Sequence, residues 1–423
     1  MSISVNDNGL YLHTKAGKNM RILHTGDLHI GKTVNNFSML EDQKYVLTQM
    51  VEMVNKHRPQ AFIIAGDVYD RAIPTAEAVS VFNDFIEELH DTGVEIFCIS
   101  GNHDSPERIS FAQEILEKKG VHFAGVYKGT CKQVCLNDND GPVIFTLMPY
   151  VKPATIRESS SDGAVRHMLS ETPFFDTARQ VLVTHYFVTN GNRAPELSDS
   201  ESHVSVGGLD NVDASYFAGF HYTALGHIHK PQRMDGAEWE ENRKLTSQGG
   251  APYGPVVYAG SPLAYSFSEC NQEKSVVMID LDGEGNATVE KLPLKPLRKM
   301  RKLKGDLINL LDPMVVLMES VKSVQEENSD ENIAVCEDYL QITLTDEDEL
   351  IDPIGTLRRV YPNVMQLLFE KREKSMDSEF VPSMEMKQKA ADELFVDFYE
   401  LLRGHEMDEA RRQVVKEVVE EVL

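Results

Sequence analysis

Five short apolar runs recur within the first 225 residues of the chain, and each is followed closely by polar residues. The runs occupy residues 21–25, 61–65, 95–100, 180–184 and 222–225. Their β-branched and other apolar side chains are typical of strands buried on both faces of a sheet. Between the first three runs, apolar residues recur at helical spacing over residues 42–57 and 76–89. This alternation predicts an α/β fold in which helices cover a central sheet.

Seven side chains that can bind a metal stand at or just beyond the ends of these runs. They are Asp27, His29, Asp67, Asn102, His185, His227 and His229. Side chains just past the carboxyl ends of parallel strands converge in one crevice of an α/β sheet. A mixed set of carboxylate, amide and imidazole donors suits manganese, iron, magnesium or zinc better than a soft metal. Because a catalytic mononuclear zinc site typically takes three protein ligands, seven donors predict two ions, and a pair of ions supports phosphoester hydrolysis.

The ordered motifs around these residues resemble the calcineurin-like metallophosphoesterases. The chain carries D-x-H at Asp27, G-D at Asp67, G-N-H-D at residues 101–104, a histidine at His185 and G-H-x-H at residues 226–229. The longer strings at residues 22–31, 100–108, 224–230 and 260–269 resemble the SbcD nuclease subunits of bacterial SbcCD complexes. This resemblance extends from about residue 20 to at least residue 295 and implies a four-layer α/β sandwich.

The resemblance also implies a role for each candidate residue. Asp67 would bridge two divalent ions, in the first place Mn²⁺, with Mg²⁺ or Fe²⁺ as alternatives. One ion would take Asp27, His29 and His229 as its other ligands, and the second would take Asn102, His185 and His227. His103 resembles the family's catalytic histidine, which protonates the leaving oxygen or stabilises charge on the phosphorus. Asp104 is either the residue that holds the ring of His103 or a turn residue before Ser105.

Composition favours an enzyme of the cytoplasm. The 423 residues are enough for two or three domains with a sizeable core. No apolar stretch reaches about 18 residues and no charged leader precedes an apolar segment, so neither a membrane span nor a secretory signal is expected. Five cysteines without paired spacing indicate a reducing compartment. Residues 1–19 are polar and aperiodic, and we expect an extension that is disordered or lies upstream of a natural start at Met20.

Two long connections interrupt the alternation of strands and helices. Residues 186–221 leave from one candidate ligand and return to two others, so we expect them to rim the active cleft. Residues 234–255, which contain the only tryptophan, are longer than the resemblance leads us to expect.

The second half of the chain predicts a small domain beside the first. Residues 20–293 are expected to form the phosphoesterase domain, which closes with a hairpin, and residues 294–375 an α+β capping domain that the resemblance places against DNA. Residues 291–304 hold seven basic residues in a chain of net charge −25, and they are either a solvated linker or a phosphate contact. The candidate DNA contacts are Arg193, Lys295, Arg298, Lys299, Arg301 and Lys302.

Residues 376–423 are expected to be a charged linker followed by two amphipathic helices. One apolar stripe contains Leu394, Phe398, Leu401 and Leu402. Two short helices cannot bury such stripes alone, so they either fold back on the capping domain or dock on a partner. The resemblance places the ATPase subunit SbcC at this position, with a homodimer of this chain inside a heterotetramer.

The resulting hypothesis is a manganese-dependent DNA nuclease subunit for repair and recombination. By resemblance it is a 3′–5′ exonuclease on double-stranded ends and an endonuclease on hairpins or single strands, controlled by an SbcC-type ATPase. A phosphatase of the same superfamily that acts on nucleotides or phosphoproteins, and a scaffold without chemistry, are the alternatives. The full ligand set argues against the scaffold, and the basic stretch and tail helices argue against the phosphatase.

Overall fold

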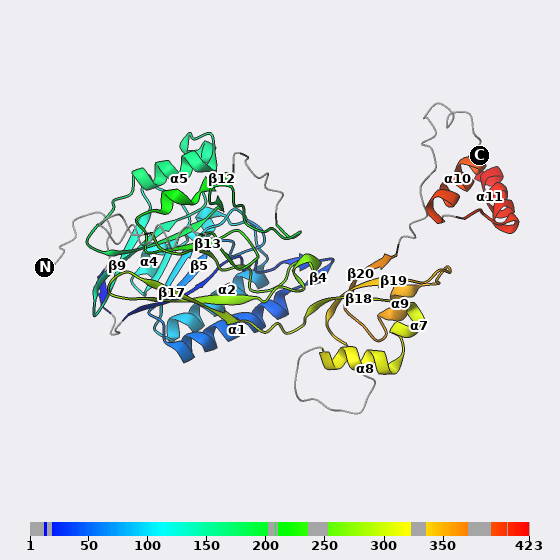
Figure 1. The fold of residues 1–423 in the computed structure, drawn as a ribbon, viewed down its shortest axis with the longest axis horizontal. Helices are drawn as coiled ribbons and strands as arrows, with labels where there is room; N and C mark the ends of the chain where they lie inside the picture. The colour runs from blue at the N-terminus through cyan, green and yellow to red at the C-terminus, as the bar shows by residue number, and fades with distance from the viewer. Residues whose placement is uncertain are drawn as a thin grey trace.

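Three parts follow one another along the chain: a large α/β domain, a smaller α+β unit and a pair of C-terminal helices (Figure 1). The computed structural model describes residues 12–14, 19–201, 208, 210–235, 253–322, 336–370, 391–403 and 405–422. The C-terminal helices lie at the opposite end of the molecule from the α/β domain. Within the described residues, no helix has the length and apolar character needed to cross a membrane.

The first of two large sheets contains four parallel strands and a closing hairpin. Its strands are β2 (Met20–Thr25), β5 (Ala61–Ala65), β6 (Glu95–Ile99), β7 (Val121–Ala124), β16 (Ser275–Leu281) and β17 (Ala287–Pro293), in the order β17-β16-β2-β5-β6-β7. Strands β2, β5, β6 and β7 pair in parallel, whereas β16 pairs antiparallel with both β2 and β17. The hairpin expected before residue 293 is therefore confirmed.

The second sheet packs face to face against the first. Its order is β1-β8-β9-β10-β13-β15-β14, with β1 (Leu12–Thr14), β8 (Lys132–Asp138), β9 (Gly141–Met148), β10 (Arg179–His185), β13 (Tyr222–Gly226), β14 (Gln232–Arg233) and β15 (Val256–Tyr258). Phe97 of the first sheet stacks on Phe145 of the second with ring centroids 4.3 Å apart. Strand β1 pairs with β8, so this part of the expected extension at residues 1–19 belongs to the sheet.

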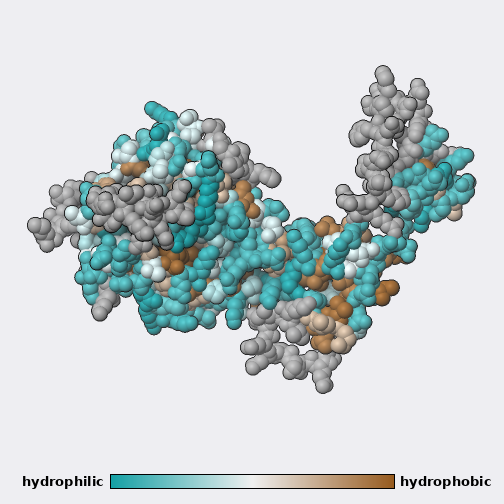
Figure 2. Space-filling model, in the orientation of Figure 1, coloured by the Kyte–Doolittle hydropathy of each residue, from teal (hydrophilic) through white to brown (hydrophobic). Residues whose placement is uncertain are grey.

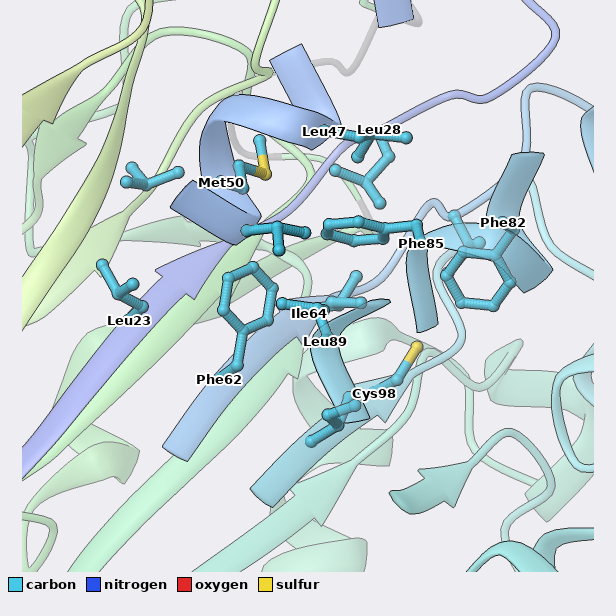
Figure 3. Packing of buried hydrophobic residues seen from close by; sticks show 14 of the residues in the cluster. Leu23, Leu28, Leu47, Met50, Phe62, Ile64, Phe82, Phe85, Leu89 and Cys98 are labelled. Atoms are coloured by element: carbon cyan, nitrogen blue, oxygen red, sulfur yellow. The ribbon is translucent and has the colours of Figure 1, made fainter. Parts of the chain in front are cut away.

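Helices cover the outer faces of both sheets. Helices α1 (Leu40–His57) and α2 (Ala76–Asp91) lie on the first sheet, and Figure 3 shows Met50, Phe85 and Leu89 packed over Phe62 and Ile64 of β5. Helix α5 (Ser161–Ser170), with β11 (Phe187–Thr189) and β12 (Asn211–Asp213), covers the second sheet. The layers therefore run helix, sheet, sheet, helix, and the predicted four-layer α/β sandwich is confirmed.

The α+β unit is a parallel three-stranded sheet with short helices. It contains β18 (Met300–Gly305), α7 (Leu307–Leu310), α8 (Pro313–Lys322), β19 (Tyr339–Leu344), α9 (Pro353–Leu357) and β20 (Val364–Phe369). The helix expected over residues 353–361 ends earlier, at Leu357, and the expected acidic loop at residues 326–331 lies outside the described residues. The other short elements are β3 (Thr33–Val34), β4 (Phe37–Ser38), α3 (Pro106–Ile109) and α4 (Gln113–Glu117), and the C-terminal helices are α10 (Ala391–Arg403) and α11 (Glu409–Val422).

Candidate metal centre

The structure brings all seven candidate ligands to one place, at the carboxyl ends of strands from both sheets. Asp27 and His29 follow β2, Asp67 follows β5, Asn102 follows β6, His185 ends β10, and His227 and His229 follow β13. Four of them, Asp27, His29, Asp67 and His227, have positive φ angles between 45° and 101°. This conformation is unfavourable for residues other than glycine, and it persists at functional sites where the surrounding structure imposes it.

The first group of donors gathers around His29. Its Nε2 atom lies 3.1 Å from Nε2 of His229 and 3.6 Å from Oδ2 of Asp67. Asp27, His29 and His229 each offer a ligand atom, and these atoms lie within 4.8 Å of one another. This arrangement can hold one cation.

The second group shares Asp67 with the first. Asp67 Oδ2 lies 3.3 Å from Nε2 of His185, which is 3.0 Å from Oδ1 of Asn102. Nδ1 of His227 lies 2.9 Å from the same amide oxygen. Nδ1 of His185 faces the carbonyl oxygen of Ala65 at 2.8 Å, which leaves its Nε2 as the metal-binding nitrogen. Asp67 therefore stands between the two groups.

The electrostatics of the centre fit divalent cations. Oδ2 of Asp27 is buried, and no hydrogen bond from any described residue reaches it. Burial raises the pKa of Asp27 to about 7, and burial lowers the pKa of His227 to about 3. Burial would also lower the pKa of His185, but the charge of Asp67 raises it to about 9, which shows how strongly the pocket attracts positive charge. Two carboxylates beside imidazoles that bind a metal in their neutral form are a suitable donor set for two metal ions, and a bound cation would replace the proton on His185.

His103 lies beside this donor set. Its backbone N–H donates to Oδ1 of Asp67 at 2.9 Å, and its ring centroid lies 4.8 Å from that of His29. Nδ1 of the ring lies 3.0 Å from the carbonyl oxygen of Asp70. If Nδ1 donates its proton to that carbonyl, Nε2 is the atom that exchanges a proton with a substrate.

Of the two alternatives for Asp104, the contact with the ring of His103 is not found, because Nδ1 of that ring faces the Asp70 carbonyl oxygen. The Asp104 carboxylate is buried and accepts backbone N–H groups of Val68 at 3.1 Å, Tyr69 at 2.9 Å and Gly101 at 2.9 Å. These donors belong to the segments that follow Asp67 and precede Asn102. Buried backbone N–H groups need hydrogen-bond acceptors, and the Asp104 carboxylate accepts from all three of these groups. The residue therefore joins two ligand-bearing loops, a role closer to the alternative of a turn residue.

Other residues that position the centre were not found from the sequence. Gln43 donates to the carbonyl oxygen of His29 at 2.7 Å and accepts the N–H of Gly31 at 2.9 Å, and the Tyr265 hydroxyl donates to the carbonyl oxygen of Leu28 at 2.5 Å. The sequence signal that could have indicated Gln43 is a polar residue within an amphipathic helix. Gln43 is buried in α1.

Comparison with known proteins decides the family. A sequence model described as calcineurin-like phosphoesterase matches residues 20–231, half of the chain. The chain belongs to this family. A second model, described as the type 5 capsule protein repressor C-terminal domain, matches residues 296–402 of this phosphoesterase. The SbcD nuclease protein of the SbcCD complex of Staphylococcus epidermidis is 27% identical over 417 residues, which cover 96% of this chain and 99% of that protein.

Two solved structures match part of the chain at low sequence identity. A protein of Thermus thermophilus matches 64% of this chain and 99% of its own with 12% identity and a TM-score of 0.36. A dimetal phosphatase from Danio rerio matches 64% of this chain and 98% of its own with 10% identity and a TM-score of 0.36.

The candidate DNA contacts Arg298 and Arg301 make ion pairs within the protein. Arg298 donates to Asp42 at 2.9 Å and Glu41 at 2.7 Å, both in α1, while Arg301 donates to Asp338 and Glu319, each at 2.6 Å. Arg298 thus ties the α+β unit to the first domain. The other four candidates, Arg193, Lys295, Lys299 and Lys302, are exposed or partly exposed.

The C-terminal helices of the phosphoesterase pack against each other and touch the α+β unit through charges. Arg403 of α10 and Arg411 of α11 both pair with Glu349, at 3.0 and 3.3 Å. Phe398 is 56% exposed, whereas the side chains of the other partner candidates, Leu394, Leu401 and Leu402, lie outside the described residues. Figure 2 also shows hydrophobic residues at the surface of the α+β unit, where Met314 of α8 is 64% exposed.

Proposed function

We propose that this chain is a metal-dependent DNA nuclease subunit that hydrolyses phosphodiester bonds. The observation that carries the proposal is Asp67, whose Oδ2 lies 3.6 Å from His29 and 3.3 Å from His185 and so serves two groups of donors. The match to the S. epidermidis nuclease protein over nearly the full length of both chains favours DNA over a small phosphate ester as the substrate. The proposed cofactor is a pair of Mn²⁺ ions.

The chemistry follows from the placement of the side chains. Two bound divalent ions supply an activated water and neutralise charge on the phosphodiester. Asp27, His29 and His229 would hold one of them, and Asn102, His185 and His227 would hold the other, with Asp67 facing both groups. His103, whose ring is oriented by the Asp70 carbonyl at 3.0 Å, gives a proton from Nε2 to the leaving oxygen. Asp104 holds the loops that carry Asp67 and Asn102 in position during the reaction.

DNA and a partner protein would be recognised outside the metal centre. In a chain with net charge −25, phosphate contacts depend on local basic groups, and we assign them to Arg193, Lys295, Lys299 and Lys302. The α+β unit would act as the DNA-facing cap. The exposed apolar residues of α10 and α11 would bind an SbcC-type ATPase in the cytoplasm, with two copies of this chain in a heterotetramer.

A nuclease assay tests the proposal. The substrate is a hairpin duplex labelled at its 3′ end or at its loop, with Mn²⁺ or Mg²⁺, with and without an SbcC-type ATPase and ATP. We expect release of the labelled 3′ nucleotide and opening of the hairpin in Mn²⁺, both increased by the ATPase, and neither in the His103→Gln variant. Hydrolysis of a nucleoside monophosphate without cleavage of DNA would identify a phosphatase, and no hydrolysis of either substrate would identify a scaffold.

A further inference from the structure

The connection between β10 and β13 reaches the metal centre through Ser200. The Ser200 hydroxyl oxygen lies 2.7 Å from Nδ1 of His229, the ring nitrogen that faces away from His29. The same hydroxyl donates to Oε1 of Glu269 at 2.5 Å. Three groups from distant parts of the chain thus form one line: the His229 ring, the Ser200 hydroxyl and the Glu269 carboxylate.

Buried groups hold the Glu269 end of this line in place. Lys274, which is 7% exposed, donates to Oε2 of Glu269 at 2.5 Å. The same ammonium group donates to the carbonyl oxygen of His229 at 2.9 Å and to the hydroxyl of Ser261 at 3.0 Å. Glu269 is completely buried, so an ion pair with Lys274 compensates its charge and keeps it ionised.

These contacts determine which atom donates each hydrogen bond. An ionised Glu269 can only accept hydrogen bonds, so the Ser200 hydroxyl must donate its single proton to Glu269. The Ser200 oxygen then accepts a hydrogen bond from its other neighbour, the protonated Nδ1 of His229. A neutral imidazole with its proton on Nδ1 has its lone pair on Nε2, the atom that lies 3.1 Å from His29 Nε2.

We propose that Ser200 and Glu269 are positioning residues that fix His229 as an Nε2 metal ligand. The inference rests on the metal centre of the proposed function but not on DNA as the substrate. Ligand histidines commonly donate their second N–H to a group that sets the tautomer and the ring orientation, and loss of that group lowers metal affinity by about 10- to 100-fold. Here that group is a serine from the long connection, backed by a buried carboxylate.

Other contacts attach the same segment of the connection and define a matched control. The Asp199 N–H donates to the hydroxyl oxygen of Ser268 at 2.9 Å, and Glu201 accepts the backbone N–H of His229. Ser268→Ala therefore removes a hydroxyl that anchors the segment one residue from Ser200 without touching the His229 ring. Ser200→Thr keeps the hydroxyl and serves as the conservative variant.

The test is a titration of the full-length protein with Mn²⁺ alone, in which calorimetry measures the binding. We expect two sites in the unchanged protein, and in Ser200→Ala a loss of about 10- to 100-fold in affinity at one of them. Ser268→Ala and Ser200→Thr should bind both ions nearly as the unchanged protein does. In the His229→Ala background, Ser200→Ala should cause no further loss, because its effect is transmitted through that ring.

Three results would overturn the inference. The first is Ser200→Ala with both affinities within a factor of about three of the unchanged protein, and the second is an equal loss in Ser268→Ala, which would reduce Ser200 to an anchor of the connection. The third is the absence of Mn²⁺ binding to the unchanged protein, which would remove the metal centre as well. A protein that binds two ions and shows the Ser200 effect but cuts no DNA would refute the proposed substrate and leave this inference intact.

Discussion

Replacing Asp104 by alanine should destabilise the protein and also reduce its turnover, because the carboxylate joins two ligand-bearing loops. Three buried backbone donors, those of Val68, Tyr69 and Gly101, lose their acceptor in Asp104→Ala. An unsatisfied buried donor costs about 1–3 kcal/mol, so the three together cost about 3–9 kcal/mol. In a domain of 150–250 residues, 1 kcal/mol lowers the melting temperature by about 2–4 °C. We therefore expect a decrease of at least about 6 °C.

Asp104→Asn should cost less, for a reason that the structure makes specific. One carboxylate oxygen, Oδ2, accepts both the Val68 and the Gly101 N–H, while Oδ1 accepts only the Tyr69 N–H. An asparagine whose carbonyl oxygen takes the place of Oδ2 leaves one donor without a partner, which costs about 1–3 kcal/mol. The order of stability should be the unchanged protein, then the asparagine variant, then the alanine variant.

Thermal unfolding followed by circular dichroism, with Mn²⁺ content measured on the same samples, checks this prediction. Asp84→Ala, an exposed substitution on α2, is the matched control and should stay within about 0.5 kcal/mol of the unchanged protein. If Asp104→Ala melted like the control, the reasoning from the three backbone donors would be refuted.

Four further outcomes are expected. Asp67→Asn should lose most bound manganese, measured by elemental analysis, with the fold retained; two equivalents per chain would contradict its bridging role. His103→Gln should keep both ions and lose about 10²- to 10⁴-fold in turnover, and a parallel loss of metal would make it a ligand. Deletion of residues 384–423 should abolish co-purification with an SbcC-type ATPase and leave manganese-dependent cleavage of a small phosphodiester. A lower melting temperature with the ATPase still bound would instead show that the C-terminal helices fold on the α+β unit. Asp42→Ala leaves the Arg298 guanidinium without its buried partner and should lower the free energy of unfolding by about 3–5 kcal/mol. The exposed Glu41→Ala should lower it by less than about 1 kcal/mol.

The candidate ligands could be read from the sequence because each stands next to a strand in the chain. Residues 61–65 were expected as a buried strand and form β5 with the same bounds, so Asp67 necessarily lies at the end of that strand. In a parallel sheet such ends share one edge, and a local pattern therefore implies a shared site. The same reasoning predicted α1 and α2, whose apolar spacing is also a local property.

Whether a charged residue faces a ligand or the protein itself depended on residues far away in the chain. Arg298 stood in a basic run that suggested DNA, yet its partner Asp42 lies 256 positions earlier in the chain. One of the two alternatives for Asp104 was a contact with its sequence neighbour His103, whereas its acceptor oxygens face N–H groups up to 36 positions away. Sequence spacing determined which side chains were available to pair. It did not determine which of them meet when the sheets stack.

The sequence by itself determined the strand ends, the two helices and the seven donors, since apolar periodicity and the residues beside it are local. Only the tertiary structure decided how that centre is held: by Gln43 and Tyr265 around His29, and by Ser200 and Glu269 behind His229. These contacts join residues separated by 12 to 237 positions. A hydrogen bond needs two groups within about 3 Å, and only the packing of the whole domain brings such distant groups to that distance.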